Sequence, residues 1–416
     1  MRPWKSLCAI SISTESEIRP RKSTAYTLAM TLRPLSRLIL LGLSLAFGSS
    51  ALPQTKDKLP RPVQMDSGVT TERNPKTGEL ILRGNGADAP GRARPSRAEI
   101  RVHSNLVEVN CNVFASDGTA VRGLTQKDFE VYEDDARQDV AHFDASSQGA
   151  SIALVLDASP SVLPDSATMK SAAQELIAGL SPVDEVAVAD FSEHTFLLLP
   201  FSRDRALLEK AVSGVDVHKL LGDLGGSNIY RSVFLAAREL FRDRTGRKAI
   251  VLLTDGQDNG LGLNLDGAGV RPHPGDPPAK MTFEDVLKVL ASRDIEVYAI
   301  STENRPQVMT PDWLSAHERQ TLITPAALAL KIPAYTAFLA ELVRVAGGQL
   351  YFLNETGSVA GAYRRIVENL SAQYTLGYYP APGERPGWHS LRVVVRGHGQ
   401  VRVTNRLAYY APPEPD

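Results

Sequence analysis

Between Ser151 and Leu370 the sequence alternates short apolar runs with longer stretches whose apolar residues recur at helical spacing. The run at 152–156 contains no polar residue, which is typical of a strand buried on both faces. Residues 169–180 then repeat apolar side chains every three or four positions, as an amphipathic helix does. Such alternation favours an open sheet covered by helices. We therefore predict an α/β domain over residues 149–372 with a doubly wound, mostly parallel sheet.

The later part of this domain continues the pattern. Residues 186–191 and 195–199 predict two strands whose three-residue connection is too short for a parallel crossover, so this pair must be antiparallel. We therefore expect one antiparallel edge strand. Two connections, 259–280 and 303–333, are far longer than a typical loop and are candidates for partner contact or disorder. The other expected elements are helices at 229–241, 283–290, 335–346 and 359–370, and strands at 249–253, 295–300 and 350–353.

The regions flanking this domain have a different pattern. Val107, Val109, Cys111 and Val113 alternate with other residues, which predicts a strand in a small β-rich segment at 98–146. Alternation at 391–395 and 401–403 predicts a C-terminal β-hairpin region at 373–412. A hairpin alone is marginally stable, so it either packs on the 98–146 segment or extends the central sheet. Residues 52–97 are rich in Pro, Gly and charge, which predicts a flexible linker.

Residues 1–51 have the features of a leader. After Met30 come two arginines, an apolar stretch at 38–47 and the small-residue sequence that ends at Ala51. We therefore predict export to a periplasmic, envelope-associated or extracellular location, with an uncleaved anchor as the alternative. Translation could begin at Met1 or Met30. Removal of the leader would leave Cys111 as the one cysteine, which excludes an intramolecular disulfide and suggests a small buried apolar residue.

Oxygen-bearing side chains follow three of the predicted elements. Asp157, Ser159 and Ser161 come directly after the first apolar strand, Ser227 precedes a helix, and Asp255 follows the strand at 249–253. Ligand-binding loops gather at the carboxyl ends of the strands in an open α/β sheet. Carboxylate and hydroxyl oxygens suit Mg²⁺, with Mn²⁺ or Ca²⁺ as alternatives. Three separate loops thus bring oxygen-bearing side chains to one edge of the sheet, although the same residue types also favour helix caps and turns.

The Asp157-x-Ser159-x-Ser161 pattern, a later hydroxyl after Gly-Gly and an Asp-Gly after a buried strand resemble the metal-ion-dependent adhesion site of von Willebrand factor A domains. The resemblance implies a Rossmann-like fold and a partner Asp or Glu carboxylate that completes the coordination of the metal. It also implies that the metal is bound by Asp157, Ser159, Ser161, Ser227 and Asp255. Ser227 stands where the family usually has Thr, and Arg231 where it often has Asp. The motifs at 123–134, 374–379 and 409–410 also resemble exported A-domain-related proteins of acidobacteria.

The function classes are narrowed by charge and by missing motifs. With 46 basic and 47 acidic residues the chain offers no charge excess for nucleic acid. No Gly-x-Ser-x-Gly motif or Cys/His cluster indicates a hydrolase or a zinc site, and the scattered histidines are expected at the surface. We therefore predict a non-catalytic adhesion or assembly protein that binds a protein ligand. The alternatives are an envelope protein whose metal only stabilises the fold and, third, a metal-assisted hydrolase.

Overall fold

The computed structural model describes residues 58–74, 78, 80–84, 106–145, 149–215, 226–261, 263, 281–317, 319–324, 329–353, 359–381 and 385–413. All of them belong to one compact unit, Thr55–Asp416. The predicted leader and most of the 259–280 connection lie outside the described residues. Among the residues that are described, no helix is long and apolar enough to span a membrane.

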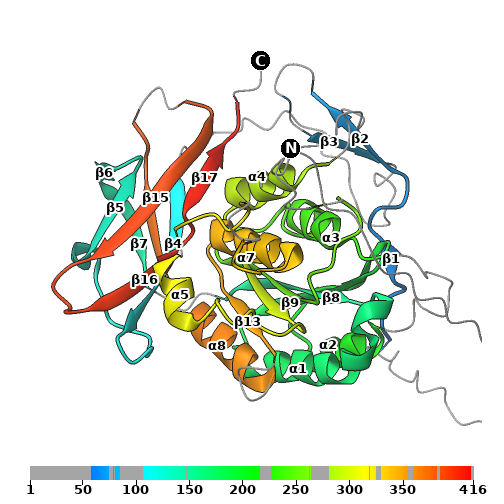
Figure 1. Cartoon of the computed structure of the whole chain (residues 1–416). Coiled ribbons are helices and arrows are strands. Elements are labelled where there is room, and N and C mark those ends of the chain that lie inside the picture. Colours follow the sequence, from blue (N-terminus) through cyan, green and yellow to red (C-terminus); the bar gives the residue numbers. More distant parts are fainter. Residues whose placement is uncertain are drawn as a thin grey trace, which may run out of the picture. The chain divides into compact units, whose positions relative to one another are not determined.

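The central sheet has seven strands in the order β1-β10-β9-β8-β11-β12-β13 (Figure 1). Strands β9, β8, β11, β12 and β13 run parallel, and β10 pairs antiparallel with β9. The predicted mostly parallel sheet with an antiparallel strand near one edge is therefore confirmed. The strands are β1 (Val63–Gln64), β8 (Ser151–Asp157), β9 (Glu185–Phe191), β10 (Thr195–Ser202), β11 (Lys248–Thr254), β12 (Ile295–Ser301) and β13 (Leu350–Phe352).

Helices cover both faces of this sheet because its strands are apolar on both sides. In β8, Ile152 and Leu154 pack into one hydrophobic core with α1 (Ser166–Gly179), α2 (Arg205–Ser213) and α8 (Val359–Ser371). Ala153 and Val155 point the other way, into a core with α3 (Ile229–Leu235), α4 (Phe283–Arg293) and α7 (Ala334–Ala346). This two-sided burial is the doubly wound arrangement that the sequence predicted. In the described part of the 303–333 connection, α5 (Pro311–Ala316) is a helix.

The predicted flexible linker at 52–97 is wrong for part of its length. Strand β1 extends the central sheet beside β10, and β2 (Val69–Arg73) pairs with β3 (Leu80–Gly84). An ion pair of 2.7 Å joins Arg73 to the buried Asp285 of α4, and Leu80 is buried in the core. Composition averaged over the segment did not reveal these few anchors, which supply specific tertiary contacts to an otherwise polar stretch.

The two flanking β regions form one sandwich, called here the β sandwich (residues 106–145 and 374–413). Its sheets have the orders β16-β4-β14-β7 and β17-β15-β5-β6. The predicted hairpin is wrong, since β15 pairs with β5 and β17 while β16 pairs with β4 in the other sheet. The strands are β4 (Val107–Ala115), β5 (Phe129–Glu133), β6 (Ala136–Gln138), β7 (Val140–Asp144), β14 (Tyr374–Tyr378), β15 (Gly387–Val395), β16 (Val401–Asn405) and β17 (Ala408–Ala411).

A shared core explains this interleaving. Val109 and Cys111 of β4, Val131 of β5 and Leu391 of β15 belong to one cluster of buried side chains. Strands from both ends of the chain are needed to enclose it, so the C-terminal region packs on the 98–146 segment rather than extending the central sheet. The Cys111 thiol is fully buried, as the sequence predicted.

The β sandwich is joined to the α/β domain by polar contacts. Asp294, which ends α4, accepts a hydrogen bond from Asn110 Nδ2 at 2.9 Å. The same carboxylate forms an ion pair with Arg406, whose Nε lies 3.1 Å away. Gly347 ends α7 at φ +89°, and a Cβ there would lie 2.5 Å from the Arg406 backbone nitrogen. A glycine is therefore required both by the left-handed conformation and by the close approach of the two chain segments.

Candidate metal centre

The structure places the five predicted ligand residues at the carboxyl-end loops of the central sheet. Asp157 ends β8, Ser159 and Ser161 follow in the turn that leads to α1, Ser227 precedes α3, and Asp255 directly follows β11. Four of the five are buried, with exposed fractions of 2 to 3%, and Ser161 is exposed. The group therefore has one member that faces solvent.

Hydrogen bonds connect four of these residues. The Ser159 backbone N–H donates to Asp157 Oδ1 at 2.9 Å, and the hydroxyl oxygens of Ser159 and Ser161 are 3.0 Å apart. The Ser227 hydroxyl donates to Asp157 Oδ2 at 3.4 Å. Side chains 70 positions apart in the sequence thus converge on a single carboxylate.

Thr254 is a member of this group that the sequence analysis missed. Its hydroxyl donates to Asp157 Oδ2 at 2.6 Å and accepts from the Gly256 N–H at 3.0 Å. It is the last residue of β11 and directly precedes Asp255, so a hydroxyl at this strand end was the available signal. We name Asp157, Ser159, Ser161, Ser227, Thr254 and Asp255 the oxygen group.

The electrostatics of the oxygen group are dominated by burial of Asp157. Burial raises the pKa of this carboxyl to about 6, hydrogen bonds from Ser159 and Thr254 lower it in part, and the nearby charge of Asp255 raises it again. The hydrogen bonds that reach Asp157 come from hydroxyl and amide groups, which are neutral. A buried carboxylate beside a second carboxylate is stabilised by a cation. The all-oxygen donor set fits a hard divalent ion such as Mg²⁺.

The loop after Asp255 holds Ser227 in place. Asn259 Oδ1 accepts from the Ser227 N–H at 2.9 Å, and the Asn259 N–H donates to the Ser227 carbonyl at 2.7 Å. A Cβ at Gly226 would lie 2.5 Å from Asn259 Oδ1, so the second glycine of the Gly-Gly pair allows this approach. Asn259 is therefore a positioning residue for Ser227.

Arg231 lies on α3, four residues after Ser227. It stands where von Willebrand factor A domains, which the sequence resembles, often have Asp. Its guanidinium lies 3.6 Å from Asp66, a buried carboxylate in the turn after β1. His194, in the turn between β9 and β10, contacts the same carboxylate at 3.0 Å. The N-terminal segment therefore contributes an acidic residue beside Arg231, in a region that the sequence had predicted to be a linker.

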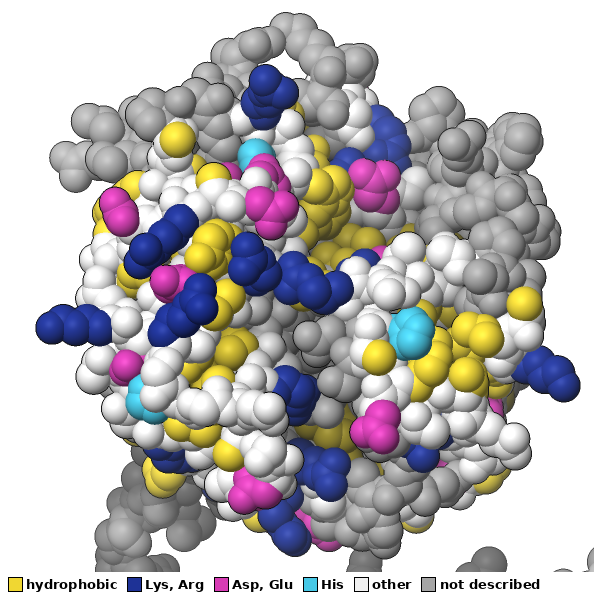
Figure 2. All heavy atoms as spheres, turned by 60° about the vertical axis from the view of Figure 1, so that its left-hand side comes forward, with side chains coloured by type: hydrophobic (Ala, Val, Ile, Leu, Met, Phe, Trp, Pro, Cys, Tyr) yellow, Lys and Arg dark blue, Asp and Glu magenta, His cyan; other side chains and the backbone are white. Residues whose placement is uncertain are grey.

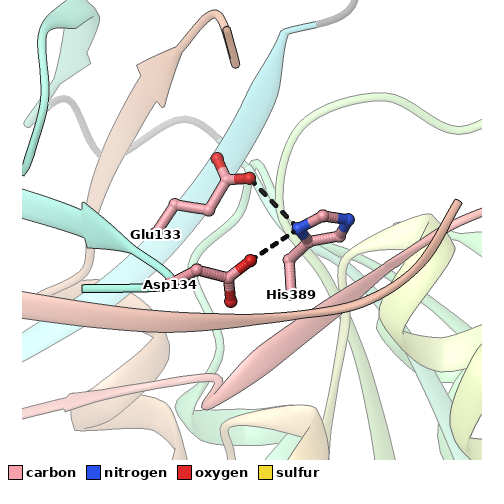
Figure 3. A group of neighbouring side chains, drawn as sticks. All are labelled: Glu133, Asp134 and His389. Atoms are coloured by element: carbon pink, nitrogen blue, oxygen red, sulfur yellow. Dashed lines mark hydrogen bonds and ion pairs between the residues drawn. The ribbon is translucent and has the colours of Figure 1, made fainter. Parts of the chain in front are cut away.

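A second group of possible ligands lies in the β sandwich (Figure 3). Nδ1 of His389 on β15 lies 2.9 Å from Asp134 Oδ2 and 3.2 Å from Glu133 Oε1, and the candidate ligand atoms all lie within 4.8 Å of one another. We name these three residues the histidine group. The expectation that the histidines lie at the surface is wrong for His389, which is 8% exposed.

The contacts of His389 define its charge. Its second ring nitrogen, Nε2, lies 2.7 Å from the Arg385 carbonyl oxygen. Both ring nitrogens face acceptor oxygens, an arrangement that suits an imidazole protonated on both nitrogens and therefore positively charged. Loss of the Nδ1 proton would convert the same three side chains into a set of one nitrogen and two oxygen ligands, with Nε2 still held by a carbonyl. Sequence spacing gave no signal, because His389 lies 255 positions from Asp134.

Comparison with known proteins agrees with this arrangement. Residues 152–257 match the family model of the von Willebrand factor type A domain, a span that contains all five predicted ligand residues. The chain contains a von Willebrand factor A domain. A search of curated proteins found no match to the sequence. The further resemblance to exported acidobacterial proteins stays a prediction.

Solved structures similar to this chain include other proteins with an A domain. An aerotolerance-related membrane protein from Bacteroides fragilis is 20% identical, with 53% of this chain and 98% of that chain covered and a TM-score of 0.36. BatB from Bacteroides thetaiotaomicron is 19% identical, with 54% and 98% covered and a TM-score of 0.36. A von Willebrand factor type A protein from Catenulispora acidiphila is 12% identical, with 68% and 74% covered and a TM-score of 0.35.

Proposed function

We propose that the A domain binds a protein partner through a divalent cation held by Asp157, Ser159, Ser161, Ser227 and Asp255, in a non-catalytic adhesion or assembly role. The observation that carries the proposal is the buried Asp157 carboxylate, to which the described residues donate only neutral hydrogen bonds and beside which lie hydroxyls and a second carboxylate. A buried charge of this kind is costly without a counter-charge, and a cation supplies one.

The donor set suggests how a partner would be recognised. Three hydroxyls are neutral ligands, so Asp157 and Asp255 are the charges that oppose the cation. A divalent ion held in this way retains an attraction for a further carboxylate, which an Asp or Glu of the partner supplies. Ser161 is the exposed member of the set, and a partner would approach the ion from its side. The proposal includes export of the chain, as the predicted leader implies, so that the interaction takes place outside the cytoplasm.

Metal binding is tested by titrating the full chain with Mg²⁺ and Mn²⁺ in a calorimeter. We expect binding to the wild type and its loss in Asp157→Ala, because the central carboxylate is removed. The matched control is Asp243→Ala, which removes an exposed carboxylate in the same domain and should leave binding unchanged. Unchanged Mg²⁺ and Mn²⁺ affinity in Asp157→Ala would refute the assignment of the site.

Partner binding is tested by capture from a cell-envelope extract with and without chelator. We expect a captured protein that is lost on chelation and in Asp157→Ala but retained by Asp243→Ala. The thermal unfolding of the same samples distinguishes the alternatives. If chelation lowers the melting temperature and leaves capture intact, the metal stabilises the loops only and the adhesion role is wrong.

A further inference from the structure

A cleft of about 970 Å³ lies between the A domain and the β sandwich. The A domain lines it with residues of α5, α7, α8 and β13, and the sandwich lines it with residues of β4 and β16. None of the five predicted metal ligands lines this cleft. It is therefore separate from the candidate metal centre, and its volume is that of a typical small-molecule site.

The cleft is strongly cationic. Asp312 is the one acidic residue among the described lining residues, whereas five arginines line it from separate parts of the chain. Figure 2 shows Lys and Arg side chains gathered around a hollow on this face of the molecule. Like charges that converge on a concave surface repel one another and focus a positive potential there. The five are Arg305, Arg319, Arg344, Arg365 and Arg402.

Three of these arginines have no carboxylate partner within the described part of the chain. Arg344 is neutralised by Glu341 through two hydrogen bonds of 2.8 and 2.5 Å. Arg319 instead donates to the Leu391 carbonyl at 3.3 Å, and Arg402 lies over the Phe114 ring at 4.9 Å. Arg365 is exposed on α8 and, like Arg319 and Arg402, forms no ion pair with the described residues. Their guanidinium groups remain available to an anion.

Arg365 and Arg402 line the cleft from its two sides. Arg365 belongs to α8 of the A domain and Arg402 to β16 of the sandwich. Burial raises the pKa of the Tyr351 hydroxyl between them, and the positive charges of Arg365 and Arg402 oppose that rise. Both charges therefore act on one hydroxyl that lines the cleft.

We infer that this cleft binds a small multivalent anion that carries phosphate or carboxylate groups, held between Arg365 and Arg402 with Arg319 nearby. The planar guanidinium group pairs with either kind of oxyanion through two parallel hydrogen bonds, so the two anion types share one recognition chemistry. A ligand with more than one charged group would contact both walls, since the arginines come from both.

The test uses calorimetry of the full chain with tripolyphosphate and with citrate as probes, in EDTA and in the Asp157→Ala background so that metal at the A domain has no effect. We expect one or both probes to bind. Arg365→Ala and Arg402→Ala should each weaken binding about tenfold, the worth of one charge-assisted hydrogen bond. The matched control is Arg364→Ala, because Arg364 is exposed on the same helix and does not line the cleft.

The outcomes separate the two sources of oxyanion. Binding of tripolyphosphate alone identifies a phosphate ligand, and binding of citrate alone identifies a carboxylate ligand. The inference is overturned if neither probe binds, or if Arg364→Ala weakens binding as much as Arg365→Ala. Binding of a pentaglutamate peptide without either small anion would also overturn it, in favour of a protein ligand. Thermal unfolding of each variant confirms that the exposed substitutions leave the fold intact.

Discussion

Two buried carboxyl groups of the A domain have different surroundings from a buried carboxyl group of the β sandwich. In the A domain, Asp157 and Glu296 receive hydrogen bonds from neutral side chains, and burial raises the pKa of both. In the sandwich, the buried Glu133 lies 3.2 Å from His389 Nδ1, which also lies 2.9 Å from the exposed Asp134. Among the described residues no ion pair reaches Asp157 or Glu296, although the charge of Arg247 lowers the pKa of Glu296 in part, whereas a histidine contacts Glu133 directly.

This difference indicates which region needs a cation. Burial raises the pKa of Glu296 to about 8, so this carboxyl is mainly protonated at neutral pH and needs no partner. The pKa of Asp157 is raised only to about 6, which leaves its carboxylate mainly ionised at neutral pH in a buried site. The sandwich already neutralises its carboxylates with an imidazolium. Of the three positions, Asp157 is therefore the one at which a metal ion supplies the missing charge.

Replacement of Glu296 by Gln has the largest expected effect on stability. The folded pKa of about 8 lies above the usual value of 4.5, so the carboxyl contributes stability below pH 4.5 that is lost as the pH rises through 8. Over this range the wild type should lose up to about 4 kcal/mol from this group. The Glu296→Gln variant should lack that slope, and urea unfolding at pH 5, 7 and 9 measures it.

The control for this prediction is Glu209→Gln, which removes an exposed carboxyl of α2. It should retain the pH dependence of the wild type. If the stability of Glu296→Gln changes with pH as much as that of the wild type, Glu296 is ionised in the folded chain. The contrast between a protonated Glu296 and an ionised Asp157 would then be wrong.

Removal of the counter-charge in the sandwich is the next largest change. His389→Ala leaves the buried Glu133 without its cation and should destabilise the chain by about 3 kcal/mol in urea unfolding. The matched control is His398→Ala, which breaks a similar pair of 3.0 Å with Asp128 whose histidine side chain is 39% exposed. That variant should lose less stability than His389→Ala, since solvent screens the pair. Equal losses would remove the distinction between buried and exposed pairs.

Addition of Zn²⁺ tests whether the histidine group is a counter-charge pair or a metal site. If His389 serves as a counter-charge, Zn²⁺ at neutral pH should leave the unfolding of the wild type unchanged. Stabilisation by Zn²⁺ in the wild type and its absence in His389→Ala would instead identify a second metal centre in the sandwich.

The smallest expected effect is that of Ser227→Thr. The added methyl group restricts χ1 while the hydroxyl is retained, so the ligand is better pre-organised and Mg²⁺ affinity should rise about threefold in calorimetry. Ser227→Ala, which removes the hydroxyl, should weaken binding. Weaker binding in Ser227→Thr than in the wild type would mean that the buried space around residue 227 does not admit the methyl group and that Ser is the required residue.

The sequence alone determined the framework of the A domain and most of its candidate site. The apolar run in β8 is buried on both faces whatever lies around it, so the sheet, its helices and the position of Asp157 at a strand end followed from local periodicity. The same argument predicted that Ser227 and Asp255 lie at the same edge of the sheet as Asp157, and the structure places them there.

Only the tertiary structure decided which distant segments meet. It placed β15 and β16 in different sheets, added β1 to the central sheet, and brought His389 to Asp134 and Arg402 to the wall opposite Arg365. Thr254 also became visible as a donor to Asp157 only through its contact. Strand periodicity specifies which face of a segment is buried, whereas its pairing partner depends on a core assembled from both ends of the chain.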